Sequence, residues 1–132
     1  MELELQDTKA IVTASSKGLG RATATELVRE DATVVISSRS EEHLQEAKRA
    51  ICADTGADHS KVIPIVCDLS DEADIESSVT EAIDRLGGLD VLVTNHGGPP
   101  SKSFDDATLD EFDAAYRSVL RSTISVIETA LP

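Results

Sequence analysis

Residues 13–20, TASSKGLG, carry the residue types that bind a phosphate group. Gly18 and Gly20 permit a tight turn and a close approach of a ligand to the backbone. Ser15 and Ser16 are candidate hydroxyl donors. If a helix opens here, its free N–H groups and partial positive charge also attract an anion. The chemistry to expect of this segment is phosphate binding, provided that a strand precedes it and a helix follows it.

The surrounding pattern meets that condition. Short β-rich runs, expected as strands at 9–14, 32–38, 61–67 and 89–95, alternate with stretches of helical spacing at 18–30, 41–54, 71–87 and 108–131. Segments 32–38, 62–67 and 91–94 of these runs are predominantly apolar rather than alternating, which is typical of parallel strands covered on both faces. The alternation predicts an α/β fold with a doubly wound parallel sheet of the Rossmann type, within a single domain spanning 1–132. We also expect Ser40 and Ser70 to cap helix N-termini and Gly87 to end the third helix.

The composition and charge of the chain argue against a nucleic-acid-binding protein and a membrane protein. The 132 residues hold 25 acidic against 12 basic side chains, a net charge of −13, which disfavours nucleic acid as a partner. The acids are dispersed, which favours a halophilic source over an ordinary acidic protein. No apolar run approaches the roughly 20 residues of a membrane helix, and the first residues do not resemble a signal peptide. Cys52 and Cys67 lack metal-ligand spacing, so we expect a cytoplasmic protein without a metal site.

Residues 13–20 resemble the TGxxxGxG cofactor loop of the short-chain dehydrogenase/reductase family. Ala14 replaces the first glycine of that pattern. The resemblance implies that Thr13, Ser15, Ser16, Lys17, Gly18, Leu19 and Gly20 form the loop that holds a dinucleotide.

Two further motifs extend the resemblance along the whole chain. CDLSD at 67–71 is similar to the family's Asp-Leu pair, which implies that Asp68 hydrogen-bonds the adenine and that Leu69 lines its pocket. TNHGG at 94–98 is similar to NNAG, with Asn95 and Gly97 retained and His96 where alanine is usual. The implied protein is the N-terminal, cofactor-binding portion of a reductase, similar to 3-oxoacyl-[acyl-carrier-protein] reductases. The implied substrate is a carbonyl or alcohol, with a 3-oxoacyl thioester as one candidate.

The end of the second expected strand predicts which cofactor is bound. NAD-preferring enzymes of this type place an acidic residue there, which accepts from the ribose 2′-OH. This chain instead has Ser38 and Arg39, and no carboxylate before Glu41. Arg39 can pair with a 2′-phosphate, and Lys17 adds a second cation. We therefore predict NADP, against the alternative that Arg39 is only a solvated surface residue.

His96 titrates near neutrality and could act as an acid or base. Its place beside the cofactor, where the family has a small residue, favours a structural role instead. The paired carboxylates Asp105 and Asp106 are explained by a solvated helix start. His43 and His59 have no neighbours in sequence that indicate a metal site.

No catalytic residue is assigned in this chain. The family uses a serine, a tyrosine and a lysine four residues after the tyrosine. Here the only tyrosine is Tyr116, followed four residues later by Leu120. The family's helix asparagine is also missing, because its place falls near Val119 or Leu120. Two explanations stay open: the N-terminal half of a longer reductase, which is favoured, or a naturally short nucleotide-binding or interaction module without turnover.

The last helix and the fourth strand predict self-association. In the family's strand order, further strands pair beside 89–95, so this chain leaves a sheet edge there. The apolar residues of 108–131 cannot all face the remaining sheet. We therefore expect a homo-oligomer joined through one of these surfaces.

Overall fold

A computed structural model of the chain describes residues 2–98 and 101–131. Four parallel strands form one sheet: β1 (Lys9–Val12), β2 (Thr33–Ser38), β3 (Val62–Val66) and β4 (Val91–Val93). Their order across the sheet is β3-β2-β1-β4. Ile11 of β1 is aligned with Val35 of β2 on one side and with Leu92 of β4 on the other. The strand order reverses direction at β1, and in such sheets ligands bind at that point, outside the carboxyl ends of the strands.

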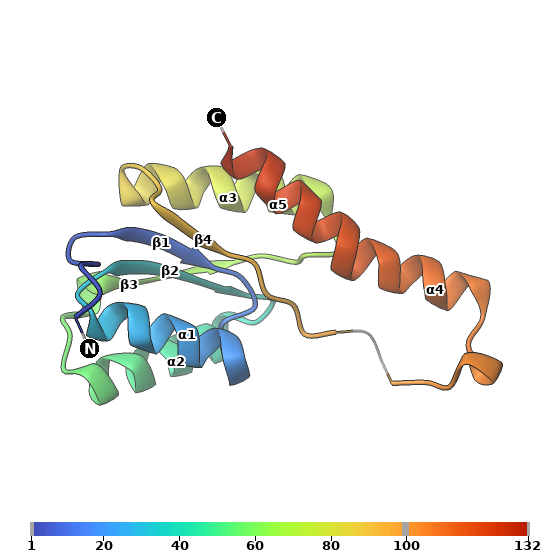
Figure 1. Cartoon of the computed structure of the whole chain (residues 1–132), viewed down its shortest axis with the longest axis horizontal. Helices are drawn as coiled ribbons and strands as arrows, with labels where there is room; N and C mark the ends of the chain where they lie inside the picture. Colours follow the sequence, from blue (N-terminus) through green and yellow to red (C-terminus); the bar gives the residue numbers. More distant parts are fainter. Residues whose placement is uncertain (1, 99–100, 132) are drawn as a thin grey trace.

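Helices cover both faces of the sheet (Figure 1). On one face lie α1 (Gly18–Arg29) and α2 (Glu41–Thr55), and on the other lie α3 (Glu72–Leu86) and α5 (Ser122–Ala130). The buried core is accordingly divided by the sheet. Side chains alternate along β1, so Val12 packs with the α1–α2 layer while Ile11 packs with the α3 layer. This is the predicted doubly wound α/β fold, and the prediction is confirmed.

The end of the chain is helical but not uniform. The expected helix over 108–131 consists of α4 (Leu109–Ala115), a π-helical segment η3 (Tyr116–Arg121) and α5. Two side-chain hydroxyls hydrogen-bond to backbone carbonyls of the π-helical segment. Ser122 Oγ donates to the Ser118 carbonyl oxygen at 2.7 Å, and Thr123 Oγ1 donates to the Val119 carbonyl oxygen at 2.7 Å. Two short 3-10 turns, His59–Lys61 and Phe104–Asp106, complete the described elements.

The helix ends follow local sequence, with one correction. Ser40 caps α2 by accepting from His43 N–H, and Gly87 ends α3 in the left-handed conformation, as expected. The cap of α3 is Asp71, whose side chain accepts from the backbone N–H groups of Ala73 and Asp74. The prediction of Ser70 was wrong because the Ser70 hydroxyl donates to Asp68 instead.

Candidate functional site

The loop between β1 and α1 needs its two glycines for different reasons. Gly18 opens α1 at φ +62°, and a Cβ on it would meet no atom within 4 Å. Gly20 is buried, and a Cβ on it would lie 2.3 Å from the Ala14 carbonyl oxygen and 2.8 Å from Asn95 Nδ2. Gly18 therefore supplies a left-handed backbone, whereas Gly20 lets the first turn of α1 pack against the loop.

Ala14 adopts a conformation that favours glycine. Its φ is +48°, in the left-handed region that an alanine side chain makes costly. This is the position at which the similar family motif has its first glycine. The backbone at residue 14 thus adopts the left-handed conformation that glycine accommodates without strain, although the residue is alanine.

Ser15 holds the loop together from inside. It is fully buried, and its hydroxyl donates to the Val12 carbonyl oxygen at 2.7 Å while accepting from Ser37 N–H at 3.0 Å. The hydrogen of the Ser15 hydroxyl is therefore donated within the protein to Val12, whereas the sequence predicts this hydroxyl as a donor to a phosphate. Ser16 is half-buried, and Lys17 and Leu19 are exposed at the start of α1.

The N-terminus of α1 is free of side-chain caps. Ser40, Asp71 and Thr108 cap α2, α3 and α4 with their side chains. Lys17, at the corresponding position of α1, makes no such bond, and the first turn of α1 has no acidic residue. The first N–H groups of α1 and its partial positive charge are therefore available to an anion.

Asn95 joins the end of β4 to the same loop. Its N–H donates to Thr13 Oγ1 at 2.7 Å, and Thr13 Oγ1 donates to the Asn95 carbonyl oxygen at 2.7 Å. The Asn95 side-chain amide also donates to the Ala14 carbonyl oxygen at 3.0 Å. These bonds fix the carboxyl ends of β1 and β4 relative to one another.

The other expected site residues lie at the carboxyl ends of their strands. Ser38 ends β2, where its hydroxyl accepts from Ser40 N–H at 3.3 Å, and Arg39 follows it, exposed. After β3, Asp68 Oδ1 accepts from the Ser70 hydroxyl at 2.7 Å and from its N–H at 3.0 Å. These bonds, helped by the charge of Arg39, hold the pKa of Asp68 below its usual value.

His96 follows β4 and is half-buried. Its Nδ1 accepts from Gly98 N–H at 2.7 Å, which requires the neutral imidazole with its proton on Nε2. Burial, together with the charge of Arg39, lowers the pKa of His96. The group is therefore neutral at pH 7, and it neighbours the cation at the end of β2. Gly97, beside it, is exposed.

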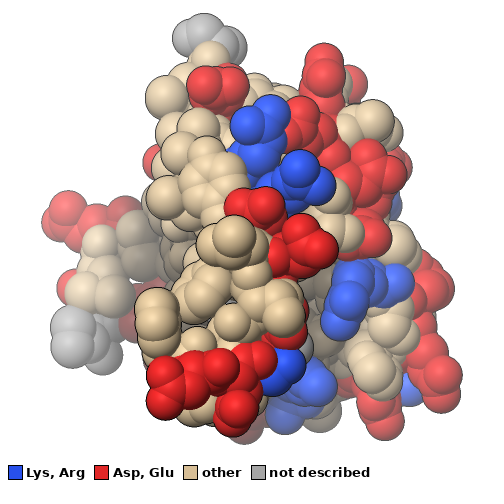
Figure 2. Space-filling view, turned by 90° about the vertical axis from the view of Figure 1, so that its right-hand side faces the viewer, with Lys and Arg blue, Asp and Glu red and all other residues tan. Residues whose placement is uncertain are grey.

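Figure 2 views the molecule from the side on which the strands end and shows basic side chains between numerous carboxylates. Lys17 and Arg39 are both exposed, and neither forms an ion pair within 4.0 Å among residues 2–98 and 101–131. Two cations thus lie outside any ion pair among the described residues, Lys17 at the uncapped start of α1 and Arg39 after β2, in a chain of net charge −13.

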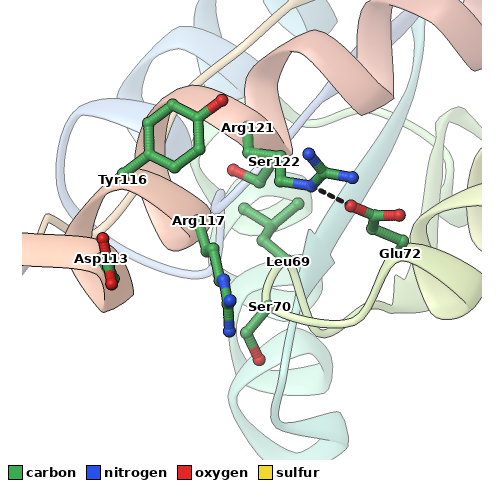
Figure 3. A pocket seen from close by; sticks show the side chains of 8 residues that line it. All are labelled: Leu69, Ser70, Glu72, Asp113, Tyr116, Arg117, Arg121 and Ser122. Atoms are coloured by element: carbon green, nitrogen blue, oxygen red, sulfur yellow. Dashed lines mark hydrogen bonds and ion pairs between the residues drawn. The ribbon is translucent and has the colours of Figure 1, made fainter. Parts of the chain in front are cut away.

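A pocket of about 600 Å³ opens between the turn after β3 and the consecutive elements α4, η3 and α5, which we call the last helix (Figure 3). It is lined by Leu69, Ser70, Glu72, Asp113, Tyr116, Arg117, Arg121 and Ser122. No motif in the sequence predicted this pocket. The only available signal was a pair of arginines four residues apart on one helix.

In the part of the chain that the structure describes, no group of three or more His, Cys, Asp or Glu side chains is arranged to hold a metal ion. None of the described helices combines the length and the apolar character that crossing a membrane requires. Burial raises the pKa of the Cys67 thiol to about 11, so it remains protonated at neutral pH.

Comparison with known proteins gives a consistent result. The family profile described as short chain dehydrogenase matches residues 8–132. An oxidoreductase of Staphylococcus aureus (strain MW2) is 30% identical over 97% of this chain and 53% of its own length. Glucose 1-dehydrogenase of Gluconobacter oxydans is 36% identical over 80% of this chain and 38% of its own length.

Solved structures agree in fold. A short chain dehydrogenase from Mycobacterium smegmatis matches with a TM-score of 0.86 and 32% identity over 96% of this chain and 51% of its own. A short chain dehydrogenase from Burkholderia cenocepacia, in complex with NADP, matches with a TM-score of 0.84 and 34% identity over 97% of this chain and 51% of its own. The chain thus spans about half the length of these relatives.

Proposed function

Because the chain belongs to the short-chain dehydrogenase family, we propose that it is the cofactor-binding part of an oxidoreductase specific for NADP(H). The whole protein would transfer a hydride between NADP(H) and a carbonyl or alcohol, with a 3-oxoacyl thioester as a candidate substrate. The nicotinamide cofactor supplies the hydride-transfer chemistry when bound. The residues of this chain bind and orient it.

The end of β2 carries the proposal of NADP over NAD. Arg39 is exposed there, with no ion pair among the described residues and no carboxylate before Glu41. A guanidinium pairs bidentately with a phosphate, whereas an NAD site needs an acceptor for the ribose 2′-OH. The neighbour from Burkholderia cenocepacia, which was solved with NADP, is consistent with this proposal.

The remaining site residues fit a dinucleotide. Lys17 and the uncapped N-terminus of α1 would face the pyrophosphate, and the open space at Gly18 allows its approach. Asp68 and Leu69, at the end of β3, would contact the adenine. The backbone at Asn95, His96 and Gly97 would border the ribose on the β4 side.

Exchanging the charge at residue 39 tests the proposal. Titration of NADPH and NADH by their fluorescence should show tighter binding of NADPH to the parent chain. Arg39→Asp should reverse this preference because a carboxylate repels the 2′-phosphate and accepts from a 2′-OH. Arg49→Asp, the same change on the exposed face of α2, is the matched control and should leave the preference unchanged. Equal binding of both cofactors to the parent chain would refute the assignment.

We further propose that the 132-residue chain alone binds NADP(H) weakly and reduces nothing. The adenine and phosphate contacts lie within it, whereas no catalytic Ser, Tyr and Lys set is assigned to it. Incubation of the purified chain with NADPH and a panel of carbonyl compounds should give no oxidation of NADPH above the buffer rate. Measurable carbonyl reduction that copurifies with the chain would contradict this expectation.

A further inference from the structure

The pocket beside the last helix has the size of a small-molecule site. Its volume of about 600 Å³ lies within the usual range for such sites. One wall is the turn after β3 and the first turn of α3, with Leu69, Ser70 and Glu72. The other is the last helix, with Tyr116 and Arg117 (Figure 3). The expected nucleotide residues at the strand ends do not line it, apart from Leu69.

The two arginines of the pocket differ in their partners. Arg121 Nε pairs with the Glu72 carboxylate, which ties the π-helical segment to α3 and lowers the pKa of Glu72. Arg117 is exposed, and no ion pair within 4.0 Å involves it in the described part of the chain. Figure 3 shows its side chain extending from the helix toward the turn that carries Ser70. Among the described residues, Arg117 is thus the pocket guanidinium that lies outside ion-pair distance of a carboxylate, although its charge also contributes to the lowered pKa of Glu72.

The remaining lining residues suit the body of a small organic molecule. Tyr116 is 49% exposed and lines the pocket beside Arg117. Leu69 contributes apolar surface on the opposite wall. An aromatic face and an aliphatic side chain contact a planar or apolar group, while a guanidinium fork matches the two oxygens of a carboxylate or phosphate.

From this arrangement we propose that the pocket is a second binding site, for a small organic anion whose carboxylate or phosphate pairs with Arg117. Glu72 and Asp113 bring negative charge to the same pocket and oppose the anion. Glu72 also holds Arg121 away from the ligand through their ion pair. The affinity of the site is thus set by the balance between Arg117 and Glu72. The pocket shares Leu69 with the proposed adenine contacts, but the pairing of an anion with Arg117 does not depend on the cofactor assignment.

Two probes distinguish the possible anions: benzoate, which carries a carboxylate on a ring, and inorganic phosphate. Binding to the parent chain is followed by the shifts of amide NMR signals at low ionic strength, where screening is weak. We expect saturable shifts at residues 69–72 and 116–122. Tighter binding of benzoate would identify a carboxylate as the ligand group, and tighter binding of phosphate would identify a phosphate.

Variants test whether the anion binds at Arg117 in this pocket or at a basic side chain elsewhere. Arg117→Gln should weaken binding by at least about tenfold, because a charge-assisted hydrogen bond is lost. Glu72→Gln should strengthen binding several-fold, because Arg121 is freed. Arg85→Gln is the matched control, since Arg85 lies on α3 outside the pocket and pairs with Glu81. Thermal melting verifies that each variant is folded.

Three results would overturn the proposal. They are the absence of saturable binding by either probe, equal binding by the parent and Arg117→Gln, and loss of binding in Lys17→Gln or Arg39→Gln but not in Arg117→Gln. The last result would place the anion at the strand ends instead. Arg117→Gln should leave the NADPH titration unchanged, so failure of this site and failure of the proposed function are distinguishable.

Discussion

Thr13 and Asn95 exchange two hydrogen bonds of 2.7 Å each across the carboxyl ends of β1 and β4, although they are 82 residues apart in sequence. Thr13 is 4% exposed, so water cannot easily replace these bonds. Thr13→Val should leave the Asn95 backbone groups without their partner and lower the free energy of unfolding by about 1–3 kcal/mol. Urea unfolding measures this loss. Thr13→Ser keeps the hydroxyl and should recover most of it, and equal losses in both variants would contradict the role of the hydroxyl.

Ala14→Gly should stabilise the protein. The φ of +48° at Ala14 strains an alanine but not a glycine. Relief of a strain of about 1–2 kcal/mol is opposed by the greater backbone freedom of glycine in the unfolded chain, about 0.4–1 kcal/mol. We therefore expect a net gain of about 0.5–1 kcal/mol in the free energy of unfolding, measured by urea denaturation. A loss of stability would show that the left-handed conformation is not the determining factor at this residue.

Gly20→Ala should disrupt the loop between β1 and α1. The added Cβ would lie 2.3 Å from a backbone oxygen of Ala14, so the loop or the first turn of α1 must shift. We expect a loss of at least about 2 kcal/mol in stability and a weaker NADPH interaction. For the loss of stability, Gly97→Ala is the matched control, since a Cβ there meets no atom within 4 Å. Comparable losses in the two variants would refute the packing argument.

His96 should make stability depend on pH. Its pKa is lowered in the folded protein, so the unfolded chain binds the proton more readily. Its contribution to stability is therefore fully present above the unfolded pKa of about 6.5 and decreases as pH falls through the lower folded pKa. His96→Asn removes the titration while retaining an acceptor near the position of Nδ1. The unfolding free energy of the parent minus that of His96→Asn should decline from pH 7.5 to pH 5. A constant difference would show that the titration of His96 does not affect stability.

The last helix should mediate self-association. Leu120 and Ile124 are 55% and 45% exposed, and five further large apolar side chains of the same helical region are also exposed: Leu109, Phe112, Tyr116, Ile127 and Leu131. Burying such area contributes about 25 cal/mol per Å². The net charge of −13 opposes association, so the average mass from light scattering should rise as salt screens the charge.

Ile124→Glu should shift this association toward monomer. Leu19→Glu, which adds the same charge at a site 82% exposed on α1, is the control and should have a smaller effect. A monomer at molar salt and high protein concentration would contradict the expectation of an oligomer.

Local patterns in the sequence determined the fold and the position of the loop between β1 and α1. Continuous apolar runs give parallel strands because both faces must be buried, and helical spacing gives the covering layers because each helix buries one side. The chain positions of Gly18, Arg39, Asp68 and Asn95 follow from the strands that precede them, since parallel strands all end at the same edge of the sheet.

The tertiary structure alone decided what each of these side chains contacts. The sequence predicts the Ser15 hydroxyl as a donor to a phosphate, yet packing between β1 and β2 buries it, and it hydrogen-bonds within the protein. Gly20 looked like a position for a ligand, but its nearest neighbours are Ala14 and Asn95. The pocket at Arg117 depends on the distance between α3 and the last helix. Such contacts join segments far apart in the chain, and residue spacing within one segment carries no information about the distance to another.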